Sequence, residues 1–154
     1  MHHFIHLKDI SSVDLRKILT DAKKRKKNRK NLNTLQIDKD ASLRGKFLIQ
    51  MFEKSSLRTR LSFNLAIKQL GGGTITLRPN ELHLGQGGES LEDTAKILST
   101  YGDGFMLRTD DDKKIDEFAK YSQIPVINGL SPSSHPTQIL SDIFTIEELT
   151  KKNI

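Results

Sequence analysis

The chain has 154 residues, of which 35% are hydrophobic and 29% charged, with no cysteine and a formal net charge of +6. This composition is typical of one soluble globular domain, and it excludes disulfides, a thiolate nucleophile and cysteine-ligated zinc. The apolar runs are far shorter than the roughly 20 residues of a membrane helix, and the first residues lack the features of a secretory signal. We therefore expect a cytoplasmic protein that does not contact a membrane.

The first predicted element is a helix that leads into a strongly basic stretch. Its apolar face has the spacing i, i+3, i+4, i+7, with Ser11 or Ser12 as the cap: Leu15, Ile18, Leu19 and Ala22. Seven of the eight residues in 23–30 are basic. The stretch could bind nucleic acid, but no aromatic residue interleaves it and no nucleic-acid motif accompanies it. We favour a solvated helix end, and salt-dependent binding to DNA or RNA would reverse that interpretation.

The rest of the chain alternates between short apolar runs and helical patterns. After a polar loop with a short helical turn before Gly45, strands are predicted at 46–52, 74–77, 105–107 and 125–127. Helical patterns follow each strand, over 63–70, 91–98, 115–119 and 139–146. The alternation predicts an α/β fold, a three-layer sandwich with a four-stranded parallel sheet flanked by helices on both faces. Ligands of such sheets bind at the carboxyl ends of the strands, which selects the loops 53–58, 79–89, 108–112 and 128–137.

The loop 53–58 has the properties of an anion site. It leads into a helix whose first turn holds Arg58, Thr59 and Arg60, so free backbone N–H groups and two guanidinium groups could converge. The alternative is that Ser55 or Ser56 merely caps the helix and the arginines are surface charges. Basic residues in a first turn oppose the helix dipole, however, which favours the anion site. No nucleotide-binding loop or dinucleotide fingerprint is present.

Two further loops carry polar groups that could reach the same crevice. Arg108 directly follows the third strand, and the run 135–138, His-Pro-Thr-Gln, opens the last helix with its proline at the first helical position. A neutral imidazole and an amide there could hydrogen-bond a carbonyl oxygen and an amino group. Taken singly, His135 could be only a cap, and His83 only a solvent-exposed side chain. The other histidines lack metal-site spacing, so we expect neither a metal nor a cofactor.

These residues resemble those of a known family. The run 52–63, Phe-Glu-Lys-Ser-Ser-Leu-Arg-Thr-Arg-Leu-Ser-Phe, is similar to the phosphate-binding signature of the carbamoyltransferases. The segments 82–85, 89–95, 128–130 and 135–138 follow in the order and spacing of that family. Aspartate carbamoyltransferases share the arginine-rich signature and the His-Pro-x-Gln run. The Asn-Gly-Leu run at 128–130 and the Phe-Glu-Lys opening instead resemble the ornithine branch.

The resemblance implies a carbamoyl-phosphate site. Ser56, Leu57, Arg58 and Thr59 would hold the phosphate, with Arg108 completing the site. Arg58, Thr59 and His135 would lie near the carbonyl oxygen, and Gln138 near the carbamoyl nitrogen. The resemblance gives catalytic roles to three of these residues: Arg58, Arg108 and His135.

Two positions bear on assembly and affinity. The resemblance implies that a neighbouring subunit of a homotrimer supplies the residue at His83, where the family has glutamine or histidine. Leu57 departs from the family, which usually has threonine there. If the lost hydroxyl bonds phosphate, binding weakens by about 1 kcal/mol.

The activity implied by the resemblance is ornithine carbamoyltransferase, a step of arginine biosynthesis. The enzyme transfers the carbamoyl group of carbamoyl phosphate to L-ornithine, giving L-citrulline and phosphate. We expect residues 1–150 to form the carbamoyl-phosphate domain and 151–154 to begin the link to an amino-acid-binding domain that binds L-ornithine, so the chain alone would be inactive. The alternatives are a carbamoyltransferase for aspartate or another amino acid, and a standalone, non-catalytic anion-binding domain.

Overall fold

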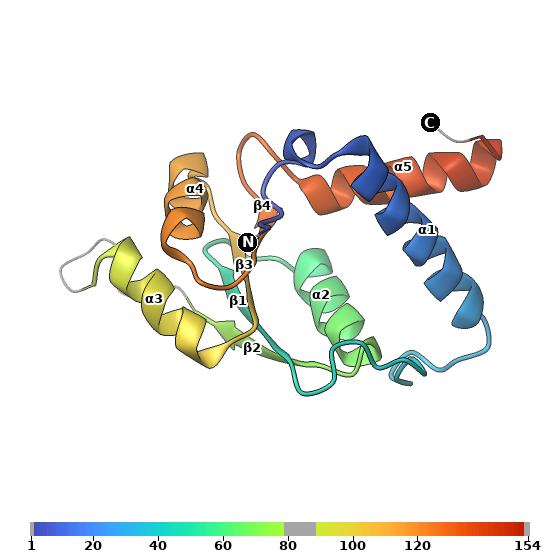
Figure 1. The fold of residues 1–154 in the computed structure, drawn as a ribbon, viewed down its shortest axis with the longest axis horizontal. Coiled ribbons are helices and arrows are strands. Elements are labelled where there is room, and N and C mark those ends of the chain that lie inside the picture. Colours follow the sequence, from blue (N-terminus) through green and yellow to red (C-terminus); the bar gives the residue numbers. More distant parts are fainter. Residues whose placement is uncertain (1, 79–88, 153–154) are drawn as a thin grey trace.

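The computed structural model describes residues 2–78 and 89–152 and places their four strands in one parallel sheet of order β2-β1-β3-β4 (Figure 1). In chain order, the elements are η1 (Leu7–Asp9), α1 (Ser12–Asn28), β1 (Phe47–Phe52), α2 (Arg58–Gln69), β2 (Gly73–Leu77), α3 (Leu91–Tyr101), β3 (Gly104–Arg108), α4 (Asp112–Tyr121), β4 (Val126–Leu130) and α5 (Pro136–Thr150). The alternation of strands and helices predicted from the sequence is thus confirmed. No helix among the described residues is both long and apolar enough to span a membrane.

The sheet is covered on both faces, which confirms the three-layer architecture. Successive side chains of a strand point to opposite faces. On β1, Ile49 and Met51 join the main core with α3 and α4, whereas Leu48 and Phe52 pack with residues of α2. In Figure 1, α3 and α4 accordingly lie on one side of the sheet and α2 on the other. Burial on both faces explains why the central strands read as continuous apolar runs.

The neighbouring strands β1 and β3 form the switch point of the sheet. The chain leaves β1 toward β2 on one side and leaves β3 toward β4 on the other. In open parallel sheets, the loops that diverge from such a pair leave a crevice at the carboxyl ends of the strands, where ligands bind. The crevice here lies between the loop after Phe52 and the loop after Arg108.

The fourth strand is longer than predicted, and the loop after it is shorter. The strand runs on to Leu130 because the buried Asn128 is held by its own side chain, whose Nδ2 donates to Ser131 Oγ at 2.9 Å and to the Ile5 carbonyl at 3.2 Å. The register with β3 shifts at Gly129, where a Cβ would overlap Met106 Sδ. A polar, glycine-containing run therefore continues a strand that the apolar pattern ended at residue 127. The predicted helical turn before Gly45 consists of hydrogen-bonded turns only.

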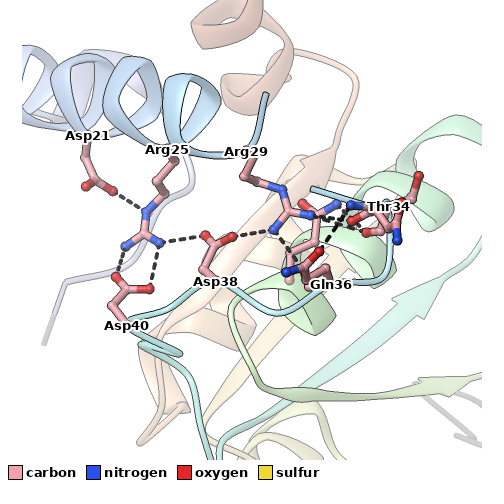
Figure 2. A network of polar contacts seen from close by, with 9 residues as sticks. Asp21, Arg25, Arg29, Thr34, Gln36, Asp38 and Asp40 are labelled. Carbon is pink, nitrogen blue, oxygen red and sulfur yellow. Dashed lines mark hydrogen bonds and ion pairs between the residues drawn. The ribbon is translucent and has the colours of Figure 1, made fainter. Parts of the chain in front are cut away.

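The basic stretch 23–30 is not simply a solvated helix end. Helix α1 continues through it to Asn28, and Figure 2 shows Arg25 between the carboxylates of Asp21 (2.7 Å), Asp40 (2.9 Å) and Asp38 (3.1 Å). Arg29 pairs with the other oxygen of Asp38. These contacts, first of all the hydrogen bond that Arg25 donates to Asp21, raise the pKa of Arg25 above its ordinary value. The solvated interpretation is therefore wrong for both arginines, which attach α1 to the loop before β1.

Two lysines of the same stretch are directed to another helix. Lys23 Nζ lies 2.9 Å from Glu147 and Lys26 Nζ 2.6 Å from Glu148, both carboxylates belonging to α5. Arg16, about two turns before Lys23 on α1, lies 2.5 Å from the same buried Glu147. Ion pairs thus join α1 to α5, and Figure 1 shows these two helices crossing each other.

Candidate functional site

The N-terminus of α2 has free N–H groups and no acidic residue. The helix begins at Arg58, its N-cap residue is Leu57, and no side chain accepts a hydrogen bond from the first turn. The alternative in which Ser55 or Ser56 caps the helix is therefore wrong. The first four N–H groups of a helix have no intrahelical acceptor, and together with the helix dipole they attract an anion. This helix end faces the crevice of the switch point because α2 directly follows the loop after β1.

Arg108 bridges the two loops of that crevice. Its Nη1 donates to Ser56 Oγ at 2.9 Å and lies 3.4 Å from Thr59 Oγ1. The guanidinium therefore lies beside the free N-terminus of α2. Arg108 is the last residue of β3, not the first residue after it as predicted. We call Ser56, Arg58, Thr59 and Arg108 the anion cradle.

A cavity of about 370 Å³ opens between α2 and α5 next to the cradle. Both helices contribute to its lining, which consists of Arg58, Thr59, Ser62, Phe63, Ala66, His135, Thr137, Gln138 and Ser141. Its volume suits a small ligand. The structure thus brings together the residues that the sequence indicated from two distant loops. Arg60 does not line the cavity, so the predicted convergence of two arginines of this helix is corrected to one.

His135 is held at the start of α5 without serving as a side-chain cap. It occupies the N-cap position, Pro136 is the first helical residue as predicted, and the ring Nδ1 lies 3.2 Å from Thr137 Oγ1. Burial, followed by the positive charge of Arg108, lowers the pKa of His135 below its ordinary value, with Asp142 opposing the shift. The imidazole is therefore neutral at neutral pH and can donate one hydrogen bond into the cavity.

Gln138 lies one helical turn from the start of α5. Its Nε2 donates to Asp142 Oδ1 at 2.8 Å, which leaves the amide oxygen available as an acceptor. A ligand in the cavity would therefore meet a donor from His135 and an acceptor from Gln138. These are complementary to a carbonyl oxygen and an amino group.

Two other predicted site residues, Leu57 and His83, are not part of the cavity as the structure describes it. Leu57 is 66% exposed and does not line the cavity. His83 lies outside the described residues.

Ser62 and Ala66 line the cavity but were not predicted from the sequence, although their spacing of four and eight residues from Arg58 puts all three on one helix face. Within 2–78 and 89–152, no three His, Asp or Glu side chains gather as metal ligands would.

These features define a class of protein: an α/β domain in which an uncapped helix and a neutral histidine line one small-ligand cavity, while a strand-end arginine contacts the start of that helix. Residues 2–148 match the family described as "Aspartate/ornithine carbamoyltransferase, carbamoyl-P binding domain". The chain belongs to this family.

Individual relatives agree over nearly the whole chain. The ornithine carbamoyltransferase of Rhizorhabdus wittichii is 46% identical over 145 residues, which cover 94% of this chain and 47% of that protein. The structure of ornithine carbamoyltransferase from Pyrococcus furiosus superposes with a TM-score of 0.90 at 39% identity, covering 98% of this chain and 46% of that one. The catalytic subunit of M. jannaschii aspartate transcarbamoylase gives 0.83 at 36% identity, covering 99% and 48%. The chain therefore spans about half the length of the relatives it matches.

Proposed function

We propose that this chain is the carbamoyl-phosphate-binding domain of an ornithine carbamoyltransferase, with residues 1–150 as that domain and 151–154 as the start of the link to an amino-acid-binding domain. The observation that carries the proposal is the contact of Arg108 with Ser56 and Thr59 beside the uncapped N-terminus of α2. Such a group of donors has a net positive field and suits a phosphate. The identity to ornithine carbamoyltransferases supports the choice of enzyme.

In this proposal, the phosphate occupies the anion cradle and the carbamoyl group extends toward α5. The neutral His135, with Arg58 and Thr59, donates to the carbonyl oxygen, and the amide oxygen of Gln138 accepts from the carbamoyl nitrogen. The carbamoyl carbon is then exposed for attack. Holding one reactant in a fixed orientation removes much of the entropic barrier to reaction.

The reaction requires no covalent enzyme intermediate. The side-chain amine of ornithine, in its neutral form, attacks the carbamoyl carbon to form a tetrahedral intermediate. The C–O bond to phosphate then breaks, the nitrogen loses a proton, and citrulline and phosphate remain. Arg58, Arg108 and His135 stabilise the negative charge that grows on the carbonyl and phosphate oxygens, and a single donor of this kind contributes roughly 3 to 4 kcal/mol.

In this proposal, residues outside this chain bind the amine, which agrees with the chain's spanning about half the length of the relatives it matches. We therefore propose that the chain binds carbamoyl phosphate but does not turn it over by itself. We further propose a cytoplasmic homotrimer in which His83 reaches the site of a neighbouring subunit. The four residues of the anion cradle all belong to one chain, so the cradle does not depend on the trimer or on His83.

The other candidate is a carbamoyltransferase that acts on aspartate, and the resemblance to the M. jannaschii aspartate transcarbamoylase favours it. Both enzymes need the same carbamoyl-phosphate site, so the cradle does not separate them. The two candidates are separated by assaying a protein that joins this chain to an amino-acid-binding domain. Citrulline formation from ornithine supports the first candidate, and carbamoyl-aspartate formation supports the second.

Amide chemical shifts of the isotope-labelled chain test the proposed site. Addition of carbamoyl phosphate is expected to move the signals of Ser56, Thr59 and His135, at the starts of α2 and α5, and to leave those of α3 unchanged. The chain alone, given ornithine as well, is expected to form no citrulline. Shifts confined to other parts of the sheet would contradict the proposed site. Turnover by the chain alone would contradict the proposal that residues outside this chain bind the amine.

A further inference from the structure

Glu53 joins the two loops that carry the anion cradle without lining the cavity. Its backbone N–H donates to the Arg108 carbonyl at 2.9 Å, which extends the β1–β3 pairing by one residue. Its side chain accepts from Thr109 Oγ1 at 2.5 Å through one oxygen and from Lys114 Nζ at 2.7 Å through the other. Three bonds thus hold the start of one loop to the start of the other and to α4.

The contacts of Glu53 are shielded from water. Thr109 is 4% exposed, and the side chains of Glu53 and Lys114 are 14% and 25% exposed. A second ion pair between the same loops, Lys54–Asp110 at 3.2 Å, is 62% and 56% exposed. Buried charge-assisted hydrogen bonds hold a geometry more firmly than exposed pairs, which contribute little. Glu53 is therefore the stronger of the two connections.

The connection continues to the third loop of the site. The N–H of Thr109 donates to the Leu130 carbonyl at 3.1 Å, at the end of the strand that leads to His135. On α4, Asp112 accepts from Ser133 Oγ at 2.9 Å, in the loop between that strand and α5. Glu53 thus lies at one end of a chain of hydrogen bonds that links the loops after β1, β3 and β4.

We propose that Glu53 is a positioning residue for the anion cradle, acting through Thr109 and Lys114 to hold Arg108 against Ser56. The inference rests on the proposed function. Arg108 directly precedes Thr109, and Ser56 lies three residues after Glu53, so loosening either loop changes the distance between the two cradle groups. Errors of about 1 Å in such an arrangement can cost a large factor in catalysis.

Electrostatics and positioning give opposite expectations for this residue. Removing a carboxylate near a positively charged site makes the local field more positive, so by charge alone an anion binds more tightly to Glu53→Gln. If Glu53 acts by positioning, the same substitution weakens binding, because the glutamine amide cannot accept from both Thr109 and Lys114 through two oxygens. The sign of the change therefore separates the two effects.

The experiment is titration of the 154-residue chain and its variants with inorganic phosphate. We expect Glu53→Gln to raise the Kd by about threefold and Glu53→Ala by about tenfold, because the amide keeps one of the two hydrogen bonds. Glu92→Gln, the same substitution in an exposed pair with Lys96 on α3, is expected to leave the Kd unchanged. Circular dichroism and thermal unfolding establish that each variant is folded at the titration temperature.

A double-mutant cycle separates positioning from a general loss of structure. In an Arg108→Ala background, Glu53→Gln is expected to have no further effect on the Kd, since the group that it positions is gone. Equal effects in both backgrounds, or an unchanged or lower Kd for Glu53→Gln alone, would overturn the inference while leaving the proposed function intact. If the unsubstituted chain binds no phosphate, the proposed function fails and the role of Glu53 fails with it.

Discussion

At the scale of single residues, the site depends on a helix N-terminus that bears a cation instead of a cap. Arg58 occupies the first helical position, the N-cap Leu57 offers no acceptor, and no acidic residue follows in the first turn. This arrangement is unfavourable for the isolated helix because the arginine opposes the dipole. It becomes favourable when an anion binds, so the local sequence is better suited to the bound state than to the free one.

Arg58 and Arg60 provide a matched comparison on this helix. Arg58→Ala is expected to weaken phosphate binding by about tenfold, since an exposed charge-assisted hydrogen bond is worth about 1.4 kcal/mol. Arg60→Ala removes the same charge two residues on, outside the cavity lining, and is expected to change the affinity by less than about twofold. Titration calorimetry at fixed salt measures both. Equal losses would mean that only net charge matters and not the position of Arg58.

His135 gives the site a pH dependence whose direction follows from its surroundings. Burial and Arg108 lower its pKa, so below about pH 6.5 there is a pH range in which the ring stays neutral in the folded chain. In the same range an unfolded histidine, with a pKa of about 6.5, takes up a proton. The free energy of unfolding is therefore unaffected by this group above about pH 6.5 and decreases as the pH falls below that value.

The titration of His135 can be followed by its ring proton signals in NMR. We expect a midpoint below about 6.5 in the free chain, and a higher midpoint when phosphate is bound, because the anion stabilises the imidazolium. Comparison with His135→Gln assigns the signal. A midpoint above the ordinary value in the free chain, or one that does not move with phosphate, would contradict the position of His135 beside the anion.

At the scale of elements, α5 is anchored by a buried acid. Glu147 is 3% exposed and lies close to Arg16 and Lys23 of α1, whose side chains are 40% and 41% exposed. The helix that begins with His135 and Gln138 is thus fixed to α1 near its other end. The position of these two site residues therefore depends in part on a contact remote from the cavity.

Glu147→Gln is expected to lower the free energy of unfolding by about 1 to 2 kcal/mol. Breaking a fully buried pair costs more, but here the two cations reach water and recover part of their hydration. Glu148→Gln, the next residue, removes an exposed pair with Lys26 and is expected to cost less than about 0.5 kcal/mol. Urea unfolding at neutral pH compares the two variants. Similar losses would contradict a special role for the buried acid.

Local patterns predicted most elements because each pattern has a local cause. Ser11 and Ser90 cap α1 and α3 through the N–H groups of Asp14 and Asp93, as expected of serine before an apolar helical face. The extra length of β4 had no such cause. It depends on Ile5, which lies more than a hundred residues earlier in the chain. Patterns within a short window do not contain contacts of this kind.

At the scale of the whole molecule, the site also has parts that the sequence predicts and parts that depend on contacts between distant segments. The order of strands and helices was enough to bring the loops after β1, β3 and β4 to one edge, so Arg58, Arg108 and His135 were predicted together. The connection of Glu53 to Thr109 and Lys114 was not predicted, because it depends on which loops become neighbours and on which side chains face inward. The sequence thus indicates the groups proposed to contact the ligand more readily than the group proposed to position them.

The distribution of charge follows from the fold as well. The basic stretch 23–30 contains more positive charge than the net excess of the chain. In the structure, Arg25, Arg29, Lys23 and Lys26 are paired with carboxylates of the loop before β1 and of α5. Much of this charge therefore serves contacts within the domain, which weakens the case for a nucleic-acid surface.

Parallel calorimetric titration of the 154-residue chain with carbamoyl phosphate and with inorganic phosphate tests the proposed site most directly. We expect carbamoyl phosphate to bind more tightly, and Gln138→Ala to remove the difference while leaving phosphate affinity nearly unchanged. Equal affinity of the unsubstituted chain for the two ligands would contradict the proposed site. In that case, the cradle would bind an anion and the cavity beside it would not recognise the carbamoyl group.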